Sequence, residues 1–327
     1  MTACLTRRQV LPMLAAAFAA TARPCAAATP AAAECVVPAK AGGGFDLTCK
    51  LAQQILAGER SVRVNYMPGG IGALAYASVV TRRPADPDLI VAFSSGSLLN
   101  LAQGKFGPHT ERDARWLAVV GTDYGVIAVR RDSPYRTLDD LMQALKRDPR
   151  TVAFGAGGTI GSQDWFKAAL LSRAAGVSHK TMRFVAFEGG GDALAALAGG
   201  HVQVVTGDAA EVSQQLARQP GIRLLAVLSA QRLPGAYAAV PTAREQGVDI
   251  VWPTARGFYV GPQVADTDFR AWSDLFRRTM AAPAFSADRA ALGLYPLTLT
   301  GDELQAFIAR QMTSYRRLAA DFQLPQQ

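Results

Sequence analysis

VVPAKAGGGFDLTCK spans residues 36–50 and places three consecutive glycines between a short apolar run and a segment with helical spacing. Glycine loses more conformational freedom on folding than any other residue, so a run of three is costly to order. Such a run is retained where another group has to approach the backbone closely, because glycine has no side chain to block the approach. We therefore expect residues 42–44 to lie against a bound group.

The same arrangement, an apolar strand followed by glycines and then a helix, recurs along the chain. Strand-like runs alternate with segments of helical spacing from residue 35 onward, with two strands expected within residues 115–134. This alternation predicts an α/β fold with parallel, doubly wound sheets. In such sheets ligands bind beyond the carboxyl ends of the strands, where helix N-termini offer unpaired N–H groups to an anion.

The glycine-rich loops lie at these strand ends. Each loop alone is also consistent with an ordinary tight turn between a strand and a helix. Taken together, they predict a cleft lined by anion-binding loops from two lobes. The loops are residues 41–46, 68–72, 94–97, 155–162, 188–192 and 206–208.

The composition is that of a packed globular protein. The chain has 327 residues, of which 50% are hydrophobic and 18% charged, enough for two domains of ordinary size. The formal net charge is +8, and the basic residues after residue 33 are scattered singly or in pairs. A nucleic-acid-binding surface would cluster them with aromatic residues, so we expect no nucleic-acid partner. A mild positive balance is compatible with the capture of anions.

The first 33 residues have the features of a cleavable signal peptide. Arg7 and Arg8 precede an apolar segment at residues 10–22, and Ala-x-Ala patterns follow at residues 26–28 and 31–33. The apolar segment is too short to span a bilayer. We therefore expect export to the periplasm, with both Sec and twin-arginine export left open.

Two cysteines remain after removal of such a signal peptide, because Cys4 and Cys25 lie within it. Cys35 and Cys49 flank the glycine run. In an oxidising compartment we expect them to form a disulfide, with two buried free thiols as the alternative. The three histidines are far apart in the sequence and match no metal-ligand spacing, so we expect no metal site.

The sequence contains no motif for a nucleotide, a cofactor or a catalytic centre. Residues 155–162, GAGGTIGS, lack the lysine of a phosphate-binding loop and match the dinucleotide fingerprint poorly. The serines of residues 94–97 and Ser162 do not form a Gly-x-Ser-x-Gly nucleophile elbow, and no pair of carboxylates indicates acid–base chemistry. The pattern favours a binding protein, with no cofactor and no catalytic residue, over an enzyme.

Six stretches, in order from about residue 35 towards the C-terminus, resemble the substrate-binding proteins of tripartite tricarboxylate transporters, also known as Bug receptors. The first and fourth stretches are most similar to the TctC branch, which is associated with citrate and related tricarboxylates. The six stretches are VPAKAGGGFDLTCKLAQQI, VNYMPGGIGALAYASVV, VAFSSGSLLNLAQGKFG, FGAGGTIGSQDWFKAAL, VAFEGGGDALAALAGGHVQVV and VPTAREQG.

The resemblance implies a two-lobed periplasmic-binding-protein (Venus flytrap) fold, in which two mostly parallel sheets flanked by helices are joined by two crossing strands. Residues 34–124 and 254–327 would form lobe 1, and residues 125–253 would form lobe 2. The implied function is capture of citrate or a related tricarboxylate between the lobes and its delivery to integral-membrane transporter subunits. Alternatives are a receptor for another small carboxylate, a citrate sensor that signals to a membrane sensor kinase, and a hydrolase or transferase acting on a carboxylate.

The resemblance also implies that one ligand carboxylate is held mainly by main-chain amides and ordered waters of the loops at residues 41–46, 94–97 and 157–163. Neutral donors there suit a multiply charged ligand, because a buried unpaired charge is expensive. Lys40 is a candidate partner for a distal carboxylate, and Arg256 for a bidentate one. The predicted ligand-binding residues are Lys40, Gly43, Gly44, Phe45, Asp46, Ser95, Ser97, Gly158, Thr159, Ser162, Gln163, Asp208 and Arg256.

Several of these residues have a structural alternative. Lys40 is otherwise a solvated loop residue, and Arg256 otherwise belongs to a hinge or an interdomain salt bridge. Asp46, being acidic beside an anion site, is better suited to capping a helix or binding loop amides than to contacting the ligand. Asp208 either accepts a hydrogen bond from a ligand hydroxyl or caps the local structure. The positions that depart from the wider family, where we expect ligand choice to be decided, are Lys40, Phe45 and residues 163–164.

Overall fold

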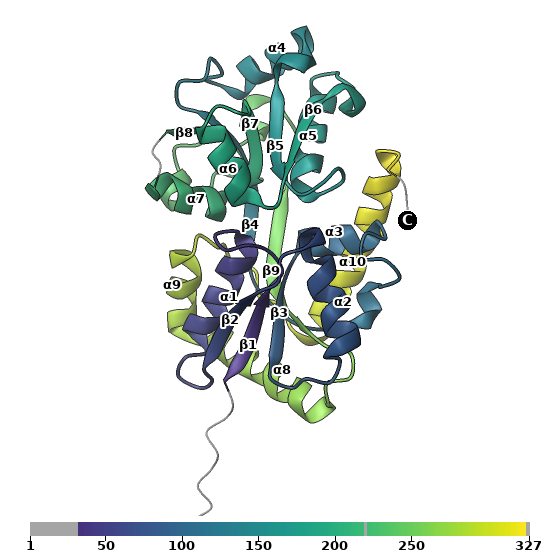
Figure 1. Ribbon diagram of the computed structural model, residues 1–327. Helices are drawn as coiled ribbons and strands as arrows, with labels where there is room; N and C mark the ends of the chain where they lie inside the picture. Colours follow the sequence, from purple (N-terminus) through teal and green to yellow (C-terminus); the bar gives the residue numbers. More distant parts are fainter. Residues whose placement is uncertain (1–31, 219–220, 325–327) are drawn as a thin grey trace, which may run out of the picture. The chain divides into compact units, whose positions relative to one another are not determined.

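The computed structural model describes residues 32–218 and 221–324 (Figure 1). Cys4, Cys25 and nearly all of the predicted signal peptide lie outside these residues. Ala33 lies inside them, because it is the first residue of β1 (Ala33–Val37) and is fully buried. Cleavage at the earlier Ala-x-Ala pattern would leave β1 intact, and the cleavage site stays a prediction. Within the described part of the chain, no helix is long and apolar enough to cross a membrane.

The first lobe is a sheet flanked by helices that come from two separate segments of the chain (Figure 1). Its further elements are α1 (Gly44–Ile55), β2 (Val62–Tyr66), α2 (Ala73–Arg82), β3 (Leu89–Ser94), α3 (Ser95–Ala102), α8 (Asp266–Ala281), α9 (Pro283–Ala291) and α10 (Gly301–Asp321). β1 lies between β2 and β3 and runs parallel to both. β3 is buried along its whole length, as expected of a strand covered on both faces.

The second lobe repeats this plan. Its elements are α4 (Leu138–Arg147), β5 (Ala153–Gly157), α5 (Gln163–Ala174), β6 (Arg183–Phe187), α6 (Gly190–Ala198), β7 (Val204–Asp208), α7 (Ala209–Arg218) and β8 (Ile222–Leu228). β5 lies between β6 and β7 and runs parallel to both. The loops that follow β5, β6 and β7 therefore meet at one edge of this sheet.

Two strands, β4 (Arg115–Arg130) and β9 (Pro253–Val260), join the lobes. The strand order is β2-β1-β3-β9-β4-β7-β5-β6, with β8 also paired to β4. β4 pairs with β9 as far as Tyr124 and with β7 and β8 from Gly125 onward, always antiparallel. The ladder thus changes partner at the boundary that we predict between the lobes, although the division of the chain into these lobes stays a prediction.

A single long strand takes the place of the two strands expected within residues 115–134, so that expectation was wrong. The glycines inside β4 serve close packing and not a turn. A Cβ atom at Gly121 would lie 3.1 Å from the Cβ of Leu294, and one at Gly125 would lie 2.9 Å from Cδ1 of Leu228. A strand that is paired along its whole length and buried on both sides has no need of a connecting loop.

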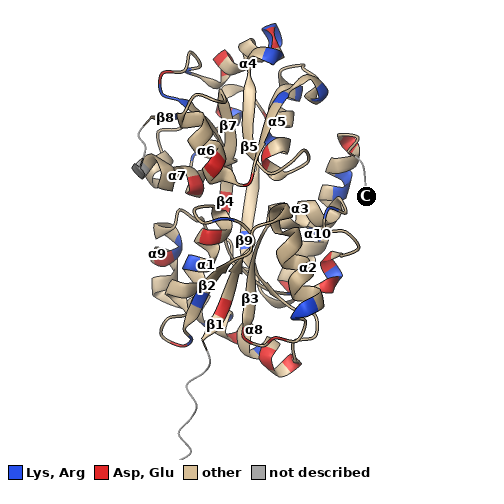
Figure 2. Cartoon of the chain, viewed as in Figure 1, with Lys and Arg blue, Asp and Glu red and all other residues tan. Residues whose placement is uncertain are grey.

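The predicted fold class is confirmed as a two-lobed α/β fold, with a sheet that is mixed because the crossing strands run antiparallel to their neighbours. One apolar cluster packs the sheet of the first lobe against α1, α8 and α9, and another packs the sheet of the second lobe against α6 and α7. A further cluster packs the crossing strands and both lobes against α2, α3, α4, α5 and α10. In the view of Figure 2, acidic and basic residues are interspersed along the helices of both lobes and are not gathered by sign.

The predicted disulfide is present: Cys35 in β1 and Cys49 in α1 are bonded, with their Cα atoms 5.7 Å apart. Both residues are fully buried. The bond closes the loop that carries the three glycines. It therefore fixes the start of α1 relative to the end of β1.

We expect the double variant Cys35→Ala/Cys49→Ala to lose about 3 kcal/mol of unfolding free energy, because the disulfide restricts the unfolded chain over a loop of 14 residues. Urea unfolding followed by circular dichroism measures the loss. Adding a reductant should destabilise the wild-type protein by a similar amount and leave the double variant unchanged. Equal stability of the double variant and the oxidised wild type would contradict the prediction.

Candidate functional site

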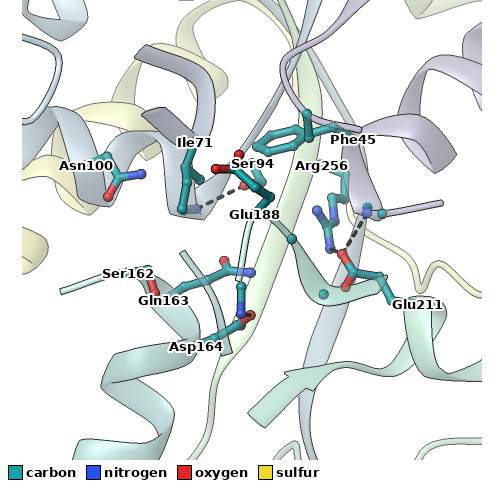
Figure 3. Close-up of a pocket in the computed structure, with 17 residues that line it drawn as sticks. Phe45, Ile71, Ser94, Asn100, Ser162, Gln163, Asp164, Glu188, Glu211 and Arg256 are labelled. Atoms are coloured by element: carbon teal, nitrogen blue, oxygen red, sulfur yellow. Dashed lines mark hydrogen bonds and ion pairs between the residues drawn. The ribbon is translucent and has the colours of Figure 1, made fainter. Parts of the chain in front are cut away.

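A cavity of about 70 Å³ lies where loops of the two lobes meet (Figure 3). Its walls include residues 43–45 from the first lobe, residues 162–164 and 188–190 from the second, Glu211 of α7 and Arg256 of β9. The loops stand at the carboxyl ends of the parallel strands, where ligands bind in α/β folds. This cavity is the candidate site.

A larger cavity of about 620 Å³ adjoins the first and shares Ile71 with its wall. Two side chains of the first lobe reach across beside it. Gln103 Nε2 donates to the carbonyl of Gly161 (2.8 Å), and Lys105 Nζ donates to the carbonyl of Ile160 (2.5 Å). Burial lowers the pKa of Lys105 to about 8. We place the site in the smaller cavity because the N-termini of α1, α3, α5 and α6 converge there.

Among the described residues, the helices α1, α3, α5 and α6 begin at the smaller cavity, and α1 and α6 have no side-chain cap. α3 and α5 are capped by the hydroxyls of Ser94 and Ser162. The N-cap residues of α1 and α6 are Gly43 and Gly189, which cannot cap their own helices. Because the first turn of a helix has unpaired N–H groups and the positive end of the helix dipole, these two N-termini attract a carboxylate.

Several predicted residues line this cavity, and their contacts account for the glycines. A Cβ atom at Gly44 would lie 2.0 Å from Nη1 of Arg256, so only a bare backbone fits against the guanidinium. Gln163 Nε2 donates to Asp208 Oδ2 (2.9 Å), and its Oε1 is buried without a partner. The predicted residues in the cavity wall are Gly43, Gly44, Phe45, Ser162, Gln163 and Arg256.

Lys40 and Asp46 make contacts outside the cavity wall. Lys40 is 60% exposed, and its Nζ lies 3.4 Å from Oδ2 of Asp192 in α6, so this ion pair joins the two lobes at the surface. Asp46 is fully buried, and its Oδ2 accepts from Gly42 N (2.8 Å) and Lys50 Nζ (2.7 Å). Burial opposes ionisation, but these hydrogen bonds hold the pKa of Asp46 below its usual value. Asp46 thus orders the glycine loop through its hydrogen bond to Gly42 and does not line the cavity.

Four further predicted residues lie outside the wall of the smaller cavity. The hydroxyl of Ser95 accepts from a backbone N–H of β9 (3.0 Å), and that of Ser97 accepts from the N-cap residue of α3 (3.2 Å). Gly158 has a φ of +92°, and a Cβ atom there would lie 2.1 Å from Cδ1 of Ile71 in the opposite lobe. Thr159 lines the larger cavity. Ser95 and Ser97 therefore support the backbone around the site.

Asp208 belongs to a buried group of charges beneath the cavity. Its Oδ1 accepts from Lys167 Nζ (2.5 Å) and its Oδ2 from Arg256 Nη2 (2.8 Å). Lys167 also donates to Asp164 Oδ1 (2.8 Å), and Arg256 lies 3.3 Å from Asp123 Oδ2. Burial opposes ionisation, but Lys167 and Arg256 hold the pKa of Asp208 below its usual value. With Glu211, these residues form what we call the ion cluster.

Glu211 is the member of the ion cluster that reaches the cavity. Its Oε1 accepts a hydrogen bond from Gly44 N (2.6 Å) and lies 3.8 Å from Arg256 Nη2. Burial raises the pKa of Glu211 to about 8, and it raises the pKa of Asp123 to about 6. Together the named members provide four carboxyl groups and two cations, so a proton shared among the carboxyl groups reduces the surplus of negative charge.

The sequence reasoning missed Asp123, Lys167 and Glu211 as members of the site. Asp123 is a single acid inside the long apolar run of β4, and Lys167 is a single cation inside WFKAALL. An isolated charge in an apolar run is a signal of buried pairing, and it was present for these two residues. For Glu211, at the start of an amphipathic helix, the sequence has no such signal.

The sequence matches the family described as "Tripartite tricarboxylate transporter family receptor" over residues 52–324, well over half of the chain. The chain belongs to this receptor family. The family consists of periplasmic solute-binding receptors, and the two-lobed fold agrees with it.

Curated relatives of this receptor are distant and are matched over part of their length. The "UPF0065 protein in gbd 5'region" of Cupriavidus necator is 25% identical over 193 residues, which cover 58% of this chain and 56% of the relative. The "UPF0065 protein in tcbD-tcbE intergenic region" of Pseudomonas sp. (strain P51) is 26% identical over 214 residues, covering 64% and 61%. The receptor thus spans less than two thirds of the length of these relatives.

Solved structures share the fold of this receptor. "Structure of a periplasmic transporter" has a TM-score of 0.80 at 18% identity and covers 90% of this chain and 98% of that one. A protein of R. palustris solved with adipate has a TM-score of 0.79 at 21% identity, with coverage of 90% and 98%. MatC from Rhodopseudomonas palustris with bound malate has a TM-score of 0.73 at 18% identity, with coverage of 88% and 98%. At these identities the likeness shows the fold alone.

Proposed function

We propose that this receptor captures a small polycarboxylate, with citrate as the leading candidate, in the cavity between its lobes and delivers it to the integral-membrane subunits of a tripartite transporter. Export to the periplasm by a cleavable signal peptide is part of the proposal. The relatives in fold that were solved with adipate and malate support the ligand class. No covalent step is proposed.

One observation carries the proposal. The backbone N–H of Gly44, at the uncapped start of α1, donates to a carboxylate oxygen 2.6 Å away. That carboxylate belongs to Glu211, so the donors at the cavity already have the geometry that a carboxylate requires. Arg256 lies at the same place and adds a positive charge that cannot be lost near neutral pH.

Calorimetric titration of the purified exported protein tests the proposal. The ligands are citrate, tricarballylate, malate, glutamate and nicotinate. We expect citrate and tricarballylate to bind more tightly than the monocarboxylate nicotinate, because more carboxylate oxygens meet donors in the cleft. Binding of the amino acid or the aromatic acid alone would overturn the tricarboxylate assignment.

Lys40 provides a test of how a distal carboxylate is held. We expect Lys40→Ala to weaken citrate by about fivefold and a monocarboxylate by much less, because only a larger anion reaches beyond the α1 loop to Lys40. Side-by-side titrations with citrate and nicotinate measure the difference. Equal weakening of both, or none, would assign Lys40 to its surface pair with Asp192.

A further inference from the structure

The carboxylate of Glu211 lies where a ligand carboxylate is expected (Figure 3). Glu211 belongs to α7 of the second lobe, and its hydrogen bond to Gly44 N (2.6 Å) crosses to α1 of the first lobe. Its side chain is 10% exposed. The contact therefore joins the lobes inside the cleft and not at its surface.

The second oxygen of Glu211 faces the other uncapped helix. A Cβ atom at Gly190, the first residue of α6, would lie 1.9 Å from Oε2 of Glu211. The carboxyl group thus lies between the first turns of α1 and α6, the two helices at this cavity whose N-cap residue is glycine. Both N-termini attract a carboxylate, and the chain itself supplies a carboxyl group there.

The surroundings of Glu211 contain polar atoms that lack partners. Arg256 is 2% exposed and lines the cavity, yet its Nε is buried without a hydrogen bond, as is Oε1 of Gln163. A buried polar atom without a partner costs free energy. The cavity of about 70 Å³ is also small beside ordinary ligand sites of roughly 300–1,000 Å³. These features describe a ligand site in which Glu211 takes the place of the ligand but leaves some of the polar groups without hydrogen-bond partners.

We propose that the carboxyl group of Glu211 is a tethered group that occupies the ligand position in the empty receptor, and that a ligand carboxylate binds by displacing it. The inference rests on the proposed function. Displacement transfers the Gly44 N–H of α1 from Glu211 to the ligand, opens the start of α6 to the ligand, and enlarges the cavity. It also replaces the direct contact of Glu211 with Gly44 by a contact made through the ligand. In the empty receptor, Glu211 itself helps to hold the two lobes together.

Glu211 then sets the affinity and the ligand class of the receptor. A ligand has to offer more than Glu211 already provides at Gly44, which favours an anion with a second carboxylate over one with a single carboxylate. Removing the tethered group should therefore tighten the binding of both by a similar factor, because both displace the same group.

The test compares citrate binding to wild type, Glu211→Ala and Glu211→Gln by calorimetry. We expect Glu211→Ala to bind citrate on the order of tenfold more tightly, because the ligand no longer has to displace a hydrogen-bond partner of Gly44. Glu211→Gln keeps an acceptor oxygen without the acidic group and should fall between the two. It also provides a second variant if the alanine protein folds poorly, which circular dichroism shows.

Glu188→Ala is the comparison for net charge, because Glu188 lines the same cavity but belongs to the loop before α6 and not to α7. It should give a clearly smaller gain than Glu211→Ala. An equal gain would show that loss of negative charge is sufficient and would overturn the displacement proposal.

A second measurement is the separation of the lobes in the empty receptor, followed by small-angle X-ray scattering. We expect a larger radius of gyration for empty Glu211→Ala than for empty wild type, and equal values when citrate is bound. If wild type binds citrate and Glu211→Ala binds it equally or more weakly, the inference fails and the proposed function stands. If no form of the protein binds a carboxylate, both fail. Binding by Glu211→Ala alone supports the inference.

Discussion

Replacing Lys167 with methionine is expected to lower the free energy of unfolding by about 3–5 kcal/mol. Lys167 is fully buried, and its Nζ donates to Asp164, to Asp208 and to the carbonyl of Gly207 at 2.5–2.9 Å. Methionine fills nearly the same space but leaves the buried Asp164 without Lys167 and leaves Asp208 paired with Arg256 alone. Removing one partner of a buried pair costs more than the pair itself contributes, because the remaining charge is unsolvated.

Urea unfolding at neutral pH measures this loss. Lys146→Met is the matched control, because Lys146 is exposed on α4 and should change the stability by less than about 0.5 kcal/mol. A loss below about 1 kcal/mol for Lys167→Met would mean that Asp164 and Asp208 are neutral in the folded protein. The ion cluster would then not be held together by charge.

The second large effect is expected at Gly44. A Cβ atom there would lie 2.0 Å from Nη1 and 2.2 Å from Cζ of Arg256, whose guanidinium is fixed by Asp208 and Asp123. Gly44→Ala should therefore push the start of α1 away from the cavity and weaken carboxylate binding on the order of 100-fold. Overpacking of this kind also costs about 1–3 kcal/mol of stability.

Gly43→Ala is the matched comparison for stability. The nearest atom to a Cβ at Gly43 is Oε1 of Glu211 at 3.8 Å, an ordinary contact, and the backbone there is extended with a φ of −100°. It should change the unfolding free energy by less than about 1 kcal/mol. Equal effects of the two substitutions on urea unfolding, or unchanged ligand affinity in Gly44→Ala, would contradict the role given to the bare backbone at Gly44.

Much of the fold follows from local patterns in the sequence. Alternating apolar runs and helical segments predict the α/β class, and the spacing of Cys35 and Cys49 around the glycine loop predicts their bond, which is present. The single strand β4 was not predicted because Gly121 and Gly125 resemble turn residues. Their actual role depends on Leu294 and Leu228, which are distant in the sequence and invisible to a local pattern.

The candidate site was predictable where it consists of loops and less so where it consists of long-range pairs. The loops with Gly44 and Gln163 reach the cavity because strand ends meet at one edge of a sheet. The contacts of Glu211 with Gly44 and of Arg256 with Asp208 join residues 167 and 48 positions apart. No spacing rule covers such distances, and only the packing of the two lobes brings these groups together.

The unbroken course of β4 limits how the cleft can open. Because β4 enters the second lobe without a loop, no flexible linker joins the lobes at this point. Opening of the cleft therefore has to bend or twist the strand itself. The ladder changes partner at Gly125, where Lys167 would meet an added Cβ atom at 3.1 Å. Lys167 of the ion cluster therefore packs against the point where the ladder changes partner, so we expect a substitution of Lys167 to affect both the bending of the strand there and the site.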